Sequence, residues 1–263
     1  MTTLSLITTT YNSAATIADT MRSVAAQTCQ PIEHLVMDGG SKDATLNIVR
    51  REGTSGLLVV SEPDKGFYDA CNKGIARAGG EVIGFINSDD FYAHDRVVEH
   101  VLDAFADPQT DAVYGDLVYV DQADPDRVVR LWRSGAITPR SLRQGFIPAH
   151  PTVYLRRSVY ERMGGFDLSY RLAADYEFLL RIFRDGALKT VYLPEIMVRM
   201  RTGGATGGGL ADIRRQNDEI LAARERHGVT CSRVGFFLRK LASRTRQRVD
   251  GRSVRLPATS WRA

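Results

Sequence analysis

The first 105 residues alternate between short apolar runs and longer amphipathic segments, and this alternation restricts the fold more than any other feature. Four apolar runs, at residues 4–10, 34–37, 57–61 and 81–86, each lead into a polar loop. After each loop, apolar residues recur every three or four positions, as on one face of a helix. Near-continuous apolar strands joined by helices are typical of a parallel sheet that is buried on both faces. The sequence therefore predicts a doubly wound α/β fold with a mostly parallel sheet.

The ends of the predicted helices carry capping and breaking residues. We expect Ser13 and Ser41 to cap the helices after the first two strands. Gly79-Gly80 is expected to end the third helix, and a fourth helix spans about 97–105. Beyond residue 110 the pattern changes. It predicts a strand pair at 112–120 and 127–132, helices at about 173–184 and 210–227, and a basic amphipathic helix that begins near residue 233.

Composition excludes several classes of protein. The three cysteines lie far apart and form no C-x-x-C pair, which excludes a disulfide framework, a zinc ribbon and a thioredoxin-type site. We expect no secretory signal at the N-terminus, and no run approaches the ~18 to 20 apolar residues that span a bilayer. Residues 233–255 hold eight Lys/Arg against one Asp, a local charge of +7, so the net charge of +4 leaves −3 for the rest. A mildly acidic body is not expected to bind nucleic acid.

The polar loops carry most of the candidate chemistry, because ligands of doubly wound sheets bind at the carboxyl ends of the strands. Asn87-Ser88-Asp89-Asp90 follows the fourth strand, and adjacent carboxylates there suit Mg²⁺ or Mn²⁺. The alternative is a simple cap for the next helix. Asp38, after the second strand, can accept hydrogen bonds from a base or ribose, and Gly39 allows close approach to the backbone. The alternative is an ordinary turn. Neither a G-x-G-x-x-G nor a Walker loop is present.

Three features of the second half each have two interpretations. Asp175 and Glu177 stand at the start of a predicted helix, where the helix dipole favours acids and where a general base can be held. His150, beside Pro151, is either structural or part of a site. The basic helix near the C-terminus fits an anionic membrane surface, a solvated helix or, least well, RNA.

Five segments in order give the chain a resemblance to a known family: residues 9–12, 36–43, 62–74, 84–90 and 173–177. Over about residues 3–201 the chain resembles family 2 glycosyltransferases of the GT-A fold, the nucleotide-diphospho-sugar transferase fold. It is most similar to small bacterial enzymes that build capsule, lipopolysaccharide or glycolipid sugars. The resemblance implies a GT-A domain over 1–210, with a nucleotide-binding half to about 110 and an acceptor half from 111, and a helical, basic extension over 211–263.

The resemblance also implies roles for individual residues. Asp175 corresponds to the catalytic base, Asp89 and Asp90 to a metal motif that takes Mn²⁺ or Mg²⁺, and His150 and Glu177 to positions near the acceptor. Asn87 stands where many relatives have aspartate, and Asp90 is expected to compensate. The expected nucleotide and donor contacts are Thr10, Tyr11, Asn12, Asp38, Gly39, Asp64, Lys65, Asn72 and Ser88.

The implied reaction is an inverting sugar transfer from a UDP-, GDP- or dTDP-sugar to a saccharide or lipid-linked acceptor. A divalent cation would neutralise the departing diphosphate, and one carboxylate would take the acceptor proton. Together with the basic tail, this predicts a cytoplasmic enzyme at the inner face of the cytoplasmic membrane. The alternatives are a sugar-nucleotide pyrophosphorylase and a non-catalytic scaffold of a membrane saccharide-assembly complex.

Overall fold

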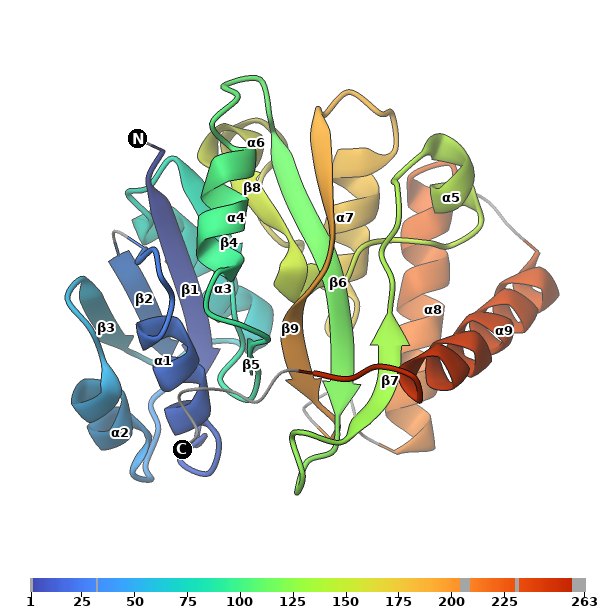
Figure 1. Ribbon diagram of the computed structural model, residues 1–263. Coiled ribbons are helices and arrows are strands. Elements are labelled where there is room, and N and C mark those ends of the chain that lie inside the picture. Colours follow the sequence, from blue (N-terminus) through green and yellow to red (C-terminus); the bar gives the residue numbers. More distant parts are fainter. Residues whose placement is uncertain (1, 32, 204–208, 230–231, 257–263) are drawn as a thin grey trace.

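The computed structural model describes residues 2–31, 33–203, 209–229 and 232–256 (Figure 1). At its centre lies a nine-stranded sheet in the order β3-β2-β1-β4-β8-β6-β9-β5, and β7 also pairs with β6. The strands are β1 (Leu4–Thr10), β2 (Glu33–Asp38), β3 (Leu57–Ser61), β4 (Val82–Phe85), β5 (Phe91–Tyr92), β6 (Ala112–Val120), β7 (Val128–Trp132), β8 (Tyr154–Arg156) and β9 (Thr190–Arg201).

The sheet is mixed but mostly parallel. β1 pairs in parallel with β2 and β4, β2 with β3, and β6 with β9. The antiparallel pairs involve the short strands β5, β7 and β8. The order β3-β2-β1-β4 is that of a doubly wound sheet. The predicted fold class is therefore confirmed.

Helices cover both faces of the sheet (Figure 1). One face carries α1 (Ile17–Ala25), α2 (Thr45–Glu52) and α4 (Val97–Ala104), and the other carries α3 (Phe67–Arg77), α6 (Arg157–Met163) and α7 (Ala174–Phe183). The largest core cluster joins α3, α6 and α7 to the sheet through side chains such as Phe85, Tyr160 and Phe178. Because both faces are buried, the central strands are apolar along their whole length.

The expected caps of the first two helices are wrong. α1 begins after Thr16 and α2 after Ala44, so neither Ser13 nor Ser41 is an N-cap. The Ser13 carbonyl accepts the N–H groups of Thr16 and Ile17, which form a turn ahead of the helix. The Ser41 hydroxyl contacts loop residues instead, so both serines organise the loops at the sheet edge.

The C-terminal part packs on the α/β body. It consists of α8 (Leu210–Arg226) and α9 (Arg233–Gly251), while α5 (Pro139–Arg143) and the 3₁₀ turn η1 (His150–Thr152) lie earlier in the chain. α8 lies along α7, and α9 lies against β7. A Cβ atom at Gly251 would be 3.0 Å from Arg130 Cα, so glycine allows the end of α9 to touch the strand. No helix in the described ranges is long and apolar enough to cross a membrane.

Candidate active site

The loops that follow the parallel strands meet at one edge of the sheet, the lower edge in Figure 1. The last residues of β1, β2 and β3 are neighbours in the register: Thr10 lies beside Asp38, and Asp38 beside Ser61. β4 runs parallel to β1 and therefore delivers the loop 86–90 to the same edge. This confirms the prediction that the polar loops gather at the carboxyl ends of the strands.

Tyr11, Gly39 and Asp64 form an exposed cradle at this edge. The Tyr11 side chain is 60% exposed. A Cβ atom at Gly39 would lie 2.6 Å from Asp64 Oδ2 and 3.4 Å from Tyr11 Cδ2, so a larger residue would separate the three loops. The backbone N–H of Gly66 donates to Asp64 Oδ1 at 2.8 Å, and Lys65 is exposed beside it. An exposed aromatic ring beside bare backbone suits stacking on a nucleotide base.

Asp38 lies beneath this cradle and is 2% exposed. Its Oδ2 accepts the backbone N–H groups of Gly40 (3.1 Å) and Ser41 (3.0 Å) and the hydroxyl of Ser61 (2.6 Å). The Ser41 hydroxyl donates to Oδ1. Asp38 therefore fixes the shape of the loop that carries Gly39, and its expected contact with a base stays a prediction.

Asn12 holds the first loop in place. Asn12 has a positive φ of 50°, a conformation that asparagine tolerates. Its N–H donates to Ser41 Oγ at 2.8 Å, and its Oδ1 accepts the N–H of Lys42 at 2.9 Å. Thr10 Oγ1 is buried without a hydrogen-bond partner among the described residues. Asn12 thus ties the first loop to the second.

Asp89 and Asp90 are adjacent but differ in environment. Asp90 is fully buried; Asn87 Nδ2 donates to its Oδ2 at 2.8 Å, and the Arg201 N–H donates to its Oδ1 at 3.2 Å. Burial, and then the charge of Asp89, raise the pKa of Asp90 well above its ordinary value. Asp89 is half-buried, and burial raises its pKa as well. Of the two carboxylates, Asp89 is the one that a ligand can reach.

Arg201 is a site residue that the sequence interpretation missed. It ends β9, is 6% exposed, and donates from Nη1 to the Asp89 carbonyl at 2.8 Å. Its Nη2 donates to Asp19 on α1. Together with the backbone contact to Asp90, these bonds hold the acidic loop from two sides. On the other side of that loop, Ser88 Oγ lies 2.9 Å from Ser13 Oγ.

Asp175 begins α7 and is half-buried at the same edge. Its Oδ1 accepts the Tyr68 hydroxyl at 2.9 Å and the Tyr176 N–H at 2.8 Å. No described residue donates to Oδ2. Burial, and then the charge of Asp175, raise the pKa of Tyr68 well above its ordinary value, so this phenol remains a donor. Tyr68 orients one oxygen of Asp175 and leaves the other available.

His150 lies near Asp175 in an aromatic environment. Its ring centroid is 5.2 Å from that of Phe85 and 5.3 Å from that of Phe166. Burial lowers the pKa of His150, and the charge of Asp175 opposes that shift. His150 is therefore a neutral imidazole within electrostatic range of the candidate base.

Two expected site residues are held by contacts with other parts of the chain. Glu177 is 1% exposed, so its carboxylate lies inside the protein. Its Oε1 accepts a hydrogen bond from Arg181 Nε at 2.9 Å and lies 2.7 Å from His227 Nε2. Two residues along a helix differ by about 200°, so Glu177 and Asp175 point in opposite directions. Asn72 makes two 2.8 Å hydrogen bonds with the backbone of Phe166. These contacts occupy both side chains inside the protein, and the expected acceptor role of Glu177 and nucleotide role of Asn72 stay predictions.

Tyr119 on β6 links the two halves of the site. Its pKa is raised by burial and, to a smaller extent, by both Asp90 and Asp175. On the neighbouring strand β9, Tyr119 pairs with Met200, next to Arg201 at the acidic loop. Tyr119 therefore lies beside the acidic loop and within electrostatic range of the candidate base.

A further cluster of possible metal ligands lies elsewhere among the described residues. His94, His100 and Glu195 have ligand atoms within 4.8 Å of one another. However, the Arg96 N–H approaches His94 Nδ1 at 3.2 Å, so Nδ1 accepts and Nε2 carries the proton toward Glu195. That tautomer fits a polar cluster around Glu195 better than a metal site. Asp89 has the carboxylate chemistry that Mg²⁺ and Mn²⁺ prefer.

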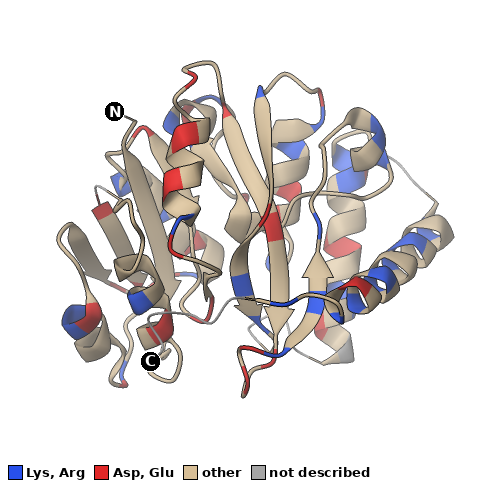
Figure 2. Cartoon of the chain, in the orientation of Figure 1, with Lys and Arg blue, Asp and Glu red and all other residues tan. Residues whose placement is uncertain are grey.

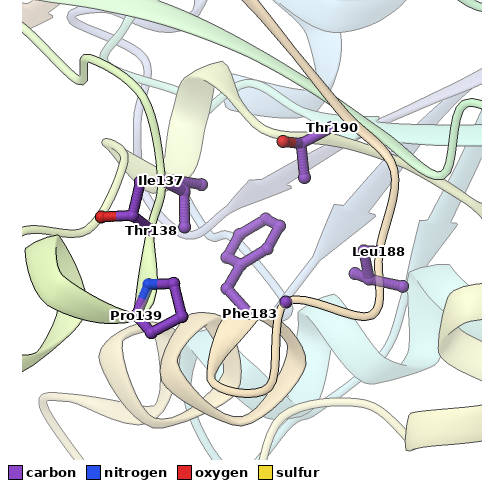
Figure 3. Close-up of a pocket in the computed structure, with 7 residues that line it drawn as sticks. Ile137, Thr138, Pro139, Phe183, Leu188 and Thr190 are labelled. Carbon is purple, nitrogen blue, oxygen red and sulfur yellow. The ribbon is translucent and has the colours of Figure 1, made fainter.

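A cavity of about 60 Å³ lies away from this edge, and Figure 3 shows the side chains that line it. Phe183 at the end of α7 and Thr190 at the start of β9 are among its lining residues. Asp175 and Arg201 lie at the opposite ends of the same two elements. The cavity is too small for a nucleotide, whose sites measure roughly 300 Å³ or more.

Comparison with known proteins identifies the family. Residues 5–164 match the family model described as glycosyl transferase family 2. The chain belongs to this family. A glycosyltransferase of PGL/p-HBAD biosynthesis from Mycobacterium bovis (strain BCG / Pasteur 1173P2) is 30% identical over 212 residues, which cover 79% of this chain and 80% of that protein. This family 2 chain is therefore a glycosyltransferase, and the pyrophosphorylase alternative is excluded.

Two solved structures share the GT-A fold of this family 2 enzyme. The mannosyltransferase PcManGT from Pyrobaculum calidifontis, in complex with GDP-Man and Mn²⁺, has a TM-score of 0.63 at 19% identity and covers 92% of this chain and 70% of its own. TarS 1-349 from S. aureus, in complex with UDP-GlcNAc, has a TM-score of 0.60 at 18% identity, with 95% and 79% covered. At these identities the likeness concerns the fold.

Proposed function

We propose that this family 2 glycosyltransferase transfers a sugar, with inversion, from a nucleoside diphosphate sugar to a hydroxyl group of a saccharide or lipid-linked acceptor. The observation that carries the proposal is the Asp175 carboxylate. One oxygen is held by Tyr68 and the Tyr176 N–H, and the other has no donor among the described residues, at the sheet edge where the acidic loop also lies. A single base on the acceptor side and one displacement invert the anomeric carbon.

The donor nucleotide is proposed to bind at the cradle. The exposed Tyr11 ring would stack on the base, and Gly39 would allow the nucleotide to approach the backbone. Lys65 is exposed next to Asp64 and can contact a phosphate. The UDP-, GDP- and dTDP-sugars all offer a base and a diphosphate of this kind. PcManGT with GDP-Man and TarS with UDP-GlcNAc show that the fold accommodates such donors.

The residues of the acidic loop suit a divalent cation, Mn²⁺ or Mg²⁺. Asp89 would supply the protein carboxylate, and such ions complete their shell with water and phosphate oxygens. Asp90 is buried and held by Asn87 and Arg201, so its proposed role is to shape the loop. A bound cation would neutralise charge on the departing diphosphate. The Mn²⁺ in the PcManGT complex supports this choice of ion.

Asp175 is proposed as the general base. Its free oxygen would accept the proton of the acceptor hydroxyl as that hydroxyl attacks. Tyr68 holds the carboxylate in one orientation through the 2.9 Å hydrogen bond. His150, neutral and close to Asp175, would face the acceptor rather than compete for the proton.

The outer side of α9 is proposed to bind the anionic inner face of the cytoplasmic membrane, as a peripheral contact. The exposed apolar side chains there are Val234, Phe237, Leu238, Leu241 and Val249. Arginines flank them along the helix (Figure 2). Basic amphipathic helices of this kind lie in the headgroup region of anionic membranes. The similarity to a protein of PGL/p-HBAD biosynthesis supports a lipid-linked acceptor.

A transfer assay with Asp175→Asn tests the proposed function. The variant keeps the size and the hydrogen-bond acceptor of the side chain but cannot act as a base. We expect release of nucleoside diphosphate in step with acceptor glycosylation to fall at least 1,000-fold, within the range of general-base catalysis, while nucleotide affinity is retained. The matched control is Glu177→Gln, whose carboxylate lies inside the protein. Undiminished transfer by Asp175→Asn would remove this residue from the mechanism. If the wild type transfers no sugar from UDP-, GDP- or dTDP-sugars, the result would favour a non-catalytic scaffold.

A further inference from the structure

We propose that Arg130 on β7 and three cations of α9, Lys240, Arg244 and Arg248, form a binding site for the phosphate group of a lipid-linked acceptor. The inference rests on the proposed function and adds the chemical class of the acceptor. We call these four residues the cation cluster. Lys and Arg residues line α9 and the neighbouring end of β7 (Figure 2).

The cation cluster adjoins the catalytic edge through β6. Arg130 is the register partner of Tyr119, so both side chains lie on one face of the sheet. The Arg130 guanidinium stacks 3.7 Å above the centre of the Tyr119 ring, and the Trp132 ring lies parallel to that of Tyr119 at 6.4 Å. Tyr119 in turn pairs with Met200 on β9, the residue before Arg201, which holds the acidic loop. An acceptor whose phosphate reaches Arg130 is therefore close to the edge where the acidic loop lies.

The three cations of α9 share one side of the helix. Lys240, Arg244 and Arg248 are spaced by four residues, which turns each by about 40° from the one before. Lys240 lies on the side that faces the body, where it donates to Asn217 on α8. Arg244 and Arg248 then lie on the border between the side of α9 that faces the body and the side that carries exposed apolar residues such as Leu241.

Charge in the cation cluster is uncompensated within the described part of the chain. None of the four cations has a carboxylate partner there, whereas the exposed Arg246 pairs with Asp250 at 3.7 Å. Burial, and then the neighbouring Arg244 and Arg248, lower the pKa of Arg130. Burial, Arg244 and Arg130 lower the pKa of Lys240 to about 8. Like charges held together in this way become favourable when an anion binds between them.

A phosphate ester on a lipid matches this arrangement. Guanidinium groups bind phosphate oxygens in pairs, so Arg130, Arg244 and Arg248 suit a phosphate or diphosphate better than a single carboxylate. Leu238 and Leu241, which are 62% and 64% exposed, adjoin the border cations and provide a surface for a lipid chain. The donor diphosphate is proposed at Asp89, so the cation cluster is left for the acceptor.

Binding measurements with the full-length protein test the site without requiring turnover. Inorganic pyrophosphate is the soluble probe, and phosphatidylcholine vesicles with 20% phosphatidic acid are the lipid probe. At roughly 1 kcal/mol per cation, each lost charge weakens binding about fivefold, so Arg244→Gln/Arg248→Gln should bind both probes about 25-fold more weakly. Arg130→Gln should weaken both about fivefold. The matched control for Arg130→Gln is Arg239→Gln, the loss of one charge on the opposite border of α9, expected to change pyrophosphate binding less than twofold.

The outcomes separate this inference from the proposed function. UDP and GDP affinity should be unchanged in all these variants, which also shows that they are folded. An equal loss of binding in Arg239→Gln would mean that general electrostatics acts here and would overturn the site. Pyrophosphate that binds without displacing the vesicles would overturn the lipid-borne phosphate. Loss of transfer in Asp175→Asn tests the proposed function alone and leaves these binding results unaffected.

Discussion

Removal of the Tyr68 hydroxyl tests how Asp175 is oriented. In Tyr68→Phe the ring keeps its contacts, with centroids 5.1 Å from Phe67 and 5.5 Å from Phe166, while the 2.9 Å hydrogen bond to Asp175 Oδ1 is lost. A hydrogen bond to a charged group is worth about 1.5–3 kcal/mol, and the Tyr176 N–H still holds the same oxygen. About 1.4 kcal/mol of transition-state stabilisation should therefore be lost, which is roughly tenfold in kcat.

The assay is steady-state release of nucleoside diphosphate at saturating donor and acceptor. KM for the donor should not change, because Tyr68 touches the base and not the cradle. The matched control is Tyr160→Phe, which removes a hydroxyl from another buried tyrosine of the same core cluster. If Tyr68→Phe keeps the full kcat, or loses no more than the control, the orienting role of Tyr68 is refuted.

Two further predictions concern stability and the acidic loop. His34 is fully buried, and burial lowers its pKa from 6.5 to about 4, so below pH 6.5 the unfolded chain binds a proton that the folded chain excludes. As the pH falls from 6.5 to 4, the free energy of unfolding should therefore fall by up to about 3 kcal/mol. Urea unfolding of His34→Gln should lack most of this pH dependence. Arg201→Met removes the contacts to Asp19 and the Asp89 carbonyl, so Mn²⁺-dependent nucleotide affinity should fall roughly tenfold by calorimetry; unchanged affinity would show that the loop holds itself.

The sequence predicts the nucleotide-binding half well because its strands are buried on both faces. Continuous apolar runs of this kind leave few other folds, and the bounds of β3 and β6 agree with the prediction. β9 was missed because Pro194 and Glu195 interrupt its pattern. The register between β6 and β9 shifts at this point, which lets the proline sit in an irregular part of the strand.

The site is less predictable because its supports are distant in sequence. Tyr68 and Asp175 are 107 positions apart, and Arg201 and Asp19 are 182 apart, so no local pattern connects them. Glu177 is different. The helical period alone indicates that it faces away from Asp175, and the sequence interpretation did not apply this test.

The central claim is that a cation held by Asp89 and the base Asp175 act on one donor–acceptor pair. Its most direct test is calorimetric titration of UDP and GDP with and without Mn²⁺ into the wild type, Asp89→Asn and Glu195→Gln, the last of which disrupts the cluster with His94 and His100. We predict that Mn²⁺ strengthens nucleotide binding at least tenfold in the wild type and Glu195→Gln, and has no effect in Asp89→Asn. Mn²⁺ enhancement that persists in Asp89→Asn would contradict the account.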